Sequence, residues 1–181
     1  MFTSAFRPKR QRGGRSKRRT RKRVPLAVLF VDTRRMANSD VLARLWRDAP
    51  EAVDEQWVNW WAENGWSPDI TWRAIEGAPD DAGPMHGRER LGRHYGEWLE
   101  LFEDIRIEAS GFVDIGERVI ARVHFSARSK STGMPLAIDY AVVHELDASG
   151  RIAAGREYAT EAEAIHAAEA ADAGHVSATK P

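Results

Sequence analysis

The chain of 181 residues contains no cysteine. This absence excludes disulfides, thiolate nucleophiles and thiolate metal sites, and it suits a reducing compartment. Long apolar runs are missing as well. The longest one near the N-terminus, Val24–Val31, is too short to span a bilayer, and Asp32-Thr33-Arg34-Arg35 follows it where a signal peptide would place small residues. We therefore expect a cytoplasmic protein without a membrane span.

Several signatures of familiar sites are also missing. The sequence has no Gly-rich phosphate loop, no Gly-x-Ser-x-Gly nucleophile elbow and no His-Glu-x-x-His motif. His86 and His94 are eight residues apart, which is not the spacing of a helical ligand pair, and we expect both at the surface. The sequence therefore predicts neither a metal nor a bound cofactor.

The net charge of zero conceals two opposite parts of the chain. Residues 1–35 contain thirteen Lys or Arg and one Asp, a net charge of +12, so the remainder carries −12. The stretch Arg7–Arg23 has too few apolar residues to form a core and is predicted to be disordered. Two interpretations stay open: a nucleic-acid-binding arm, or an over-extended gene model whose natural start is Met36.

Residues 36–171 are predicted to form one α+β domain, with a frayed tail at 172–181. Asn38 or Ser39 is a candidate cap for a first helix, and Asp48-Ala49-Pro50-Glu51 resembles the capping box of a second helix that ends at Asn64-Gly65. The tryptophans of the second helix, Trp57, Trp60 and Trp61, suit either a ligand-stacking wall or plain core.

A third helix is predicted to open at Gly87-Arg88-Glu89, after an exposed loop at 76–86. One of its faces is apolar and must lie on a sheet; it carries Leu91, Tyr95, Trp98, Leu99 and Phe102. Trp72, on the strand predicted at 70–75, is a further pocket candidate. A last helix is predicted from the capping box at Thr160 to about Ala171.

Three apolar runs predict an antiparallel meander: Arg118–Arg128, Met134–Leu146 and Arg151–Tyr158. Short Gly-containing links join them, as in hairpins, and a strand at 105–113 precedes them. In the first run, Arg122 and His124 alternate with apolar residues, so they lie on the polar face. In the second run, Tyr140, Val142 and His144 share the bulky face, and both sides are predicted to be partly covered.

Several short sequence motifs, in their order and spacing, resemble those of the SnoaL-like group of the nuclear transport factor 2-like superfamily, over about residues 41–171. These motifs are Asp69-Ile70-Thr71-Trp72, Gly87-Arg88-Glu89 with Trp98 to Phe102, the run 112–119, Gly150-Arg151-Ile152 and Arg156-Glu157-Tyr158. The resemblance implies an α+β cone, in which a strongly curved antiparallel sheet wraps around the N-terminal helices. It also implies a pocket between them and a homodimer through the sheet.

Relatives in this superfamily include ketosteroid isomerases, polyketide cyclases and limonene epoxide hydrolases. The position at which ketosteroid isomerases carry a buried Asp falls near Val142 here, and Asp139 lies on the other side of that strand. Glu157 matches an acidic residue of the epoxide hydrolases. Arg122 matches their Arg if one gap is allowed, and His124 stands where their second Asp should be.

These comparisons predict a small-molecule pocket lined by Trp72, Tyr95, Trp98, Tyr140 and Val142, which takes a hydrophobic organic ligand. If the protein is an enzyme, we expect cofactor-free isomerase, cyclase or hydrolase chemistry, with Glu157 or His144 transferring the proton. A salt bridge to Arg122 or Arg128 is the structural alternative for Glu157. The competing function is a non-catalytic dimeric interaction or carrier domain, with the basic arm holding nucleic acid.

Overall fold

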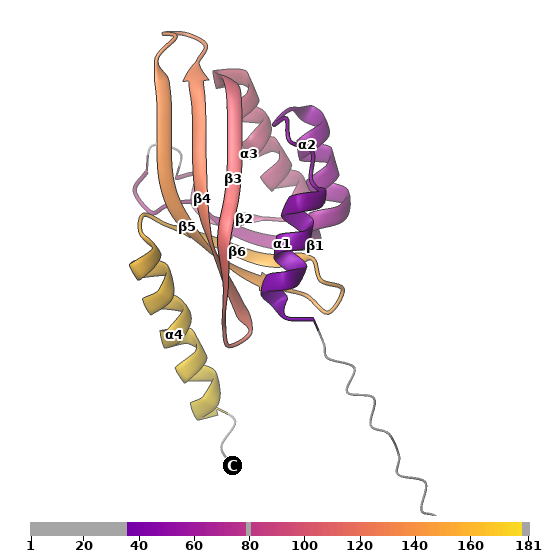
Figure 1. The fold of residues 1–181 in the computed structure, drawn as a ribbon, viewed down its shortest axis with the longest axis vertical. Helices are drawn as coiled ribbons and strands as arrows, with labels where there is room; N and C mark the ends of the chain where they lie inside the picture. Colours follow the sequence, from indigo (N-terminus) through magenta and orange to yellow (C-terminus); the bar gives the residue numbers. More distant parts are fainter. Residues whose placement is uncertain (1–35, 79–80, 179–181) are drawn as a thin grey trace, which may run out of the picture. The chain divides into compact units, whose positions relative to one another are not determined.

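The structure, a computed structural model, describes residues 36–78 and 81–178 (Figure 1). The basic segment and its two interpretations lie outside these residues. The described chain is α+β, as predicted, and runs in the order α1 (Asn38–Asp48), α2 (Glu55–Trp60), a π-helical turn (Trp61–Gly65), β1 (Trp66–Arg73), β2 (Met85–His86), α3 (Arg88–Leu101), β3 (Phe102–Ile115), β4 (Arg118–Ser129), β5 (Pro135–Leu146), β6 (Ile152–Tyr158) and α4 (Glu161–Ala178). None of the described helices is long and apolar enough to cross a membrane.

The six strands form one sheet in the order β2-β1-β6-β5-β4-β3. The meander of β3, β4, β5 and β6 is antiparallel throughout, which confirms the prediction. Gly133 and Gly150 turn the links before and after β5 with φ of 69° and 83°, a backbone region that side chains other than glycine rarely adopt. Among the described strands, β1 and β6 are the parallel pair, so the beginning and the end of the domain meet within the sheet.

The two faces of the sheet are covered by different helices, and the long strands bend along their length (Figure 1). Tyr140 and Val142 of β5 belong to a large apolar core beneath α1, α2 and α3, and we call this side the inner face. Ala141 and Val143 point the other way and pack with Ala164 and Ala168 of α4, on the outer face. The middle of β5 is therefore buried on both sides, as the sequence predicted.

The centre of the inner core is a cluster of aromatic rings. Trp57 contacts Trp61, Trp66 and Tyr95 with ring centroids 5.8, 6.5 and 5.3 Å apart. The indole of Trp66 also stacks on Tyr95 at 5.6 Å. Offset and edge-on pairs of this kind add roughly 1 kcal/mol each to the gain from burial. The tryptophans of α2 are therefore core residues, as in the simpler of the two interpretations.

Several predicted helix ends differ from the structure. Asp54 caps α2, since its Oδ1 accepts from the backbone N–H groups of Gln56 and Trp57, so the capping box proposed at Asp48 was wrong. Ser39 does not cap α1 but bonds to Asp114 of β3. The capping box at Thr160 is confirmed by reciprocal bonds with Glu163, both 3.2 Å long. Its helix continues to Ala178 rather than ending near Ala171.

The strands also extend further than predicted. The first one begins at Trp66, because the π-helical turn ends at Gly65 and passes directly into β1. The strand β3 begins at Phe102, which the helical pattern had assigned to the face of α3. The other predicted residues of that helix do face the core: Leu91 is fully buried, and Trp98 contacts Phe125 of β4 at 4.9 Å.

Candidate functional site

A buried carboxylate lies on the inner face, near the end of the last strand. Glu157 is paired with Val142 of β5 and is 8% exposed. Its Oε1 accepts a hydrogen bond of 3.0 Å from Nε1 of Trp72 on β1. Carboxylates are seldom buried unless they are paired or hydrogen-bonded, so a carboxylate held by an indole within an apolar core marks a functional candidate.

The position of Trp72 depends on a glycine of β6. Gly155 is paired with Trp72 in the parallel ladder and with His144 on its other side. A side chain at Gly155 would collide with the six-membered ring of Trp72. The six-membered ring of Trp72 therefore lies close to the backbone of β6 at Gly155, and its Nε1 reaches Glu157, two residues further along the strand.

His144 is the second ionisable group of this cluster. It is 1% exposed, and its ring lies edge-on to Trp72 with centroids 5.9 Å apart. Burial lowers the pKa of His144 to about 4, although hydrogen bonding to the backbone of Val119 and Val142 raises the pKa and offsets part of this shift. Its Nδ1 has no hydrogen-bond partner within the described part of the chain. At neutral pH, His144 is an uncharged imidazole with unused hydrogen-bonding capacity.

The other predicted pocket residues share this core but are spread through it. Tyr140 and Val142 lie on the same face of β5 as His144. Tyr95 and Trp98 of α3 contact each other at 5.4 Å and belong to the aromatic cluster around Trp57 and Trp66. The structure thus brings Trp72, Val142, His144 and Glu157 together, while the two α3 residues are part of the adjoining aromatic core.

Arg122 and His124 lie on the outer face. Arg122 is paired with Ala141, and His124 with Asp139, whose Oδ1 is 2.7 Å from Nδ1 of the imidazole. The ring and its partner are both solvent-exposed. The sheet separates these residues from Glu157, so the arrangement suggested by the epoxide hydrolases is not met. Arg128, the other salt-bridge candidate for Glu157, lies near Asp104 of β3 instead.

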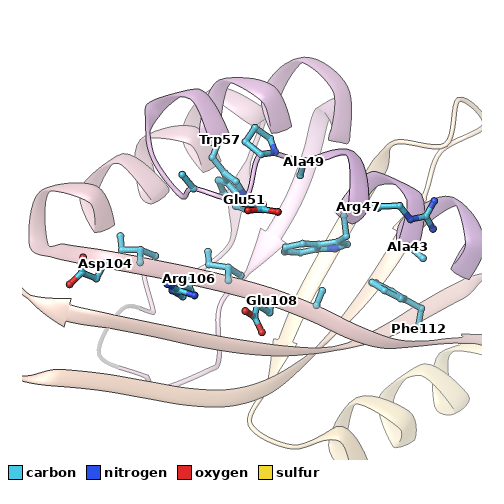
Figure 2. A pocket seen from close by; sticks show the side chains of 15 residues that line it. Ala43, Arg47, Ala49, Glu51, Trp57, Asp104, Arg106, Glu108 and Phe112 are labelled. Atoms are coloured by element: carbon cyan, nitrogen blue, oxygen red, sulfur yellow. The ribbon is translucent and has the colours of Figure 1, made fainter.

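Two depressions lie away from this cluster. A groove of about 1100 Å³ runs along β3 beneath α1 and the connection to α2 (Figure 2). A second depression, of about 430 Å³, includes Arg122, His124, Asp139 and Thr160 in its wall. Tyr140 also borders it, but neither depression includes Glu157 or His144.

One buried histidine was misplaced by the sequence analysis. His94 is 5% exposed, rather than at the surface, and its ring lies 5.8 Å from Tyr95 and 5.4 Å from Trp98. Its position three residues after Leu91 and one before Tyr95 could have placed it on the apolar face of α3. In the part of the chain that the structure describes, no three His, Asp or Glu side chains are grouped to hold a metal.

The comparisons with known proteins agree with this architecture. A protein from Burkholderia thailandensis described as NTF2-like is 20% identical, with a TM-score of 0.56 over 67% of this chain and 89% of that one. TerC, co-crystallised with polyporic acid, is 14% identical, with a TM-score of 0.54 over 74% and 98%. A Mycobacterium tuberculosis protein in complex with estradiol-17beta-hemisuccinate is 12% identical, with a TM-score of 0.54 over 67% and 93%.

At these identities the likeness shows the fold. A search of curated proteins found no match. The model of the SnoaL-like domain matches residues 48–155, which is more than half of the sequence. The chain therefore belongs to the SnoaL-like domain family, within the NTF2-like fold.

Proposed function

We propose that this SnoaL-like domain binds a hydrophobic organic molecule on the inner face of its sheet, where Glu157 transfers the proton and His144 hydrogen-bonds to the ligand. Two proteins of the same fold are known with such ligands, polyporic acid and a steroid hemisuccinate. The observation that carries the proposal is the buried carboxylate of Glu157, held by Trp72 next to an imidazole with an unused Nδ1.

The two groups suit different roles in cofactor-free acid/base chemistry. A carboxylate in an apolar site is a suitable base for a proton next to a carbonyl or for an attacking water. The neutral imidazole of His144 can hydrogen-bond to the ligand oxygen that gains charge, because its burial keeps it unprotonated at pH 7. This division of roles is compatible with isomerase, cyclase or hydrolase chemistry.

The burial of the cluster also defines how a ligand must bind. Trp72, Tyr140, His144 and Glu157 are all at least nine-tenths buried. A ligand reaches the carboxylate only if aromatic side chains move aside, which makes binding an induced fit. The same burial favours the second candidate function, a carrier that encloses its ligand without chemical change.

Thermal-shift screening against terpenoid epoxides, steroids and polyketide-like enones, followed by turnover assays on the hits, tests both functions. Glu157→Gln should abolish turnover while the ligand still binds, and the exposed α4 variant Glu169→Gln should behave as the wild type. Saturable binding without turnover would support the carrier. Turnover that survives Glu157→Gln, or no binding by any of the three classes, would contradict the proposal.

A further inference from the structure

One row of side chains along β5 passes from the surface of the protein into its core. Leu136 and Ile138 are 44% and 42% exposed. The next three residues of the row are buried, in the order Tyr140, Val142 and His144. Alternate residues of a strand share one side of the sheet, so all five point to the same face. The row therefore connects the surface with the buried cluster around His144.

The partners of the exposed pair show that this is the inner face. Leu136 is paired with Ala127 of β4, and Ile138 with Phe125. Both partners belong to the large apolar core beneath the helices. Trp98 of α3 lies against Phe125 at 4.9 Å and so covers the β4 side of the row. Leu136 and Ile138 thus form an aliphatic strip, which we call the β5 strip, at the margin of the inner core.

The other side of the β5 strip is open. The ladder with β4 extends over residues 135–145 of β5, whereas the ladder with β6 covers only residues 141–146. Among the described residues, no strand is therefore paired with the far side of residues 135–140. Figure 1 shows the hairpin of β4 and β5 at the end of the sheet away from α4. A molecule can approach the strip from this side without displacing a strand.

We propose that the β5 strip holds the apolar tail of a ligand whose reacting end lies at Glu157, so that the preferred ligand is an oxo compound with a linear alkyl chain. This inference rests on the proposed function, which places the head of the ligand at Glu157 and His144. Continuity carries it: Val142, the fourth member of the row, is the residue paired with Glu157.

The chemistry of the strip favours an alkyl chain. Its two exposed members are aliphatic, and the neighbouring row on β4 is already occupied by Trp98. The strip is therefore about one strand spacing wide, roughly 5 Å, which suits a single extended chain. Tyr140 stands between Ile138 and Val142 in the row, so its ring is the side chain that must turn aside when the head of the ligand passes.

The geometry of the strand also defines a length. Val142 and Ile138 are four residues apart, a distance of about 14 Å along a strand. With carbon–carbon bonds of about 1.5 Å, an extended chain of roughly twelve carbons covers this distance. Shorter ligands can reach the carboxylate without touching the strip, whereas longer ones bury methylene groups on it.

Isothermal titration calorimetry of the full chain with 2-alkanones, from 2-decanone to 2-tetradecanone, tests the proposal. The affinity should rise along the series, because each methylene placed on the strip leaves water and adds about two- to fourfold. Leu136→Ser and Ile138→Ser should each weaken the binding of 2-tetradecanone by about fivefold or more. The binding of 2-decanone should stay at the wild-type level. Because both side chains are already exposed, circular dichroism should show an unchanged fold.

Val113→Ser is the matched control, since it removes another exposed aliphatic side chain, on β3, and should leave the whole series unchanged. An affinity that stays level along the series, or long-chain binding untouched by both strip variants, would overturn the proposal. If a steroid or terpenoid epoxide binds and no alkanone does, the proposed function stands and the alkyl-tail inference fails. A strip variant that changes the sedimentation of the ligand-free protein would assign the strip to a contact between chains instead.

Discussion

Trp72 donates its indole N–H to the carboxylate of Glu157, and the 3.0 Å bond links the first long strand of the sheet to the last. The two residues come from adjacent parallel strands, β1 and β6. This bond gives the buried carboxyl group a hydrogen-bond donor inside the apolar core.

Trp72→Phe should test the stabilising effect of that bond. The substitution takes one hydrogen-bond donor away from a buried carboxyl group, so we expect a loss of about 1–3 kcal/mol in the free energy of unfolding. Urea denaturation measures it. Trp61→Phe is the control, because Nε1 of Trp61 is buried and already lacks a partner among the described residues. Equal losses in the two variants would show that ring size, not the hydrogen bond, is responsible.

Gly155→Ala should disturb the same cluster from the backbone side. The added Cβ would collide with the ring of Trp72, and overpacking of this kind costs about 1–3 kcal/mol. Gly96→Ala in α3 is a matched control: nothing lies within 4 Å of the new Cβ, and alanine is the better helix former by about 1 kcal/mol. Thermal unfolding should therefore move in opposite directions for the two variants.

His144 should make stability depend on pH. Its pKa is about 4 in the fold and about 6.5 when unfolded, so the unfolded chain binds more protons between these values. Stability due to this group is complete above pH 6.5 and is lost as the pH falls toward 4, by a total of about 3 kcal/mol. The wild type minus His144→Phe difference in unfolding free energy should show this slope.

Carboxylates also titrate in this pH range and change the stability of every variant. The effect of His144 is therefore measured from the difference between variants rather than from the wild type alone. His166→Gln, at an exposed position of α4, should retain the wild-type pH profile. A His144→Phe profile parallel to that of the wild type between pH 6.5 and 4 would show that the imidazole is not held neutral by burial.

The capping box of α4 offers a further test. Thr160→Ala removes the acceptor for the N–H of Glu163 and should cost about 1 kcal/mol, whereas Thr160→Ser keeps the hydroxyl and should cost much less. Hydrogen exchange of α4 amides would localise the loss. If exchange rises equally in both variants, the methyl group rather than the cap is what holds the helix start.

The fold followed from local patterns in the sequence. Gly133 and Gly150, at turns between alternating runs, were sufficient for the antiparallel meander, because short links restrict which strands can be neighbours. The face shared by Tyr140, Val142 and His144 followed from the period of two. The capping box at Thr160 was visible for the same reason: its two partners are three residues apart.

The site was harder to predict from the sequence than the fold, because its contacts join residues that are far apart along the chain. No local pattern connects Trp72 with Glu157 or shows that Gly155 makes room for the indole between them. The cap of α2 was misassigned because Asp48 and Asp54 both precede apolar helical spacing, and the choice depends on how the chain turns at Pro50. The burial of His94 was not predicted, because histidine is polar and its residue type was given more importance than its position on the apolar face of α3.

The parallel pairing of β1 with β6 also has a consequence for biosynthesis. Trp72 and Glu157 are 85 residues apart, so most of the domain must leave the ribosome before they can meet. Contacts of such sequence separation slow folding. Until β6 emerges, the edge of the tryptophan-rich β1 that later pairs with β6 is open, a state that chaperones would recognise and in which C-terminally truncated products would aggregate.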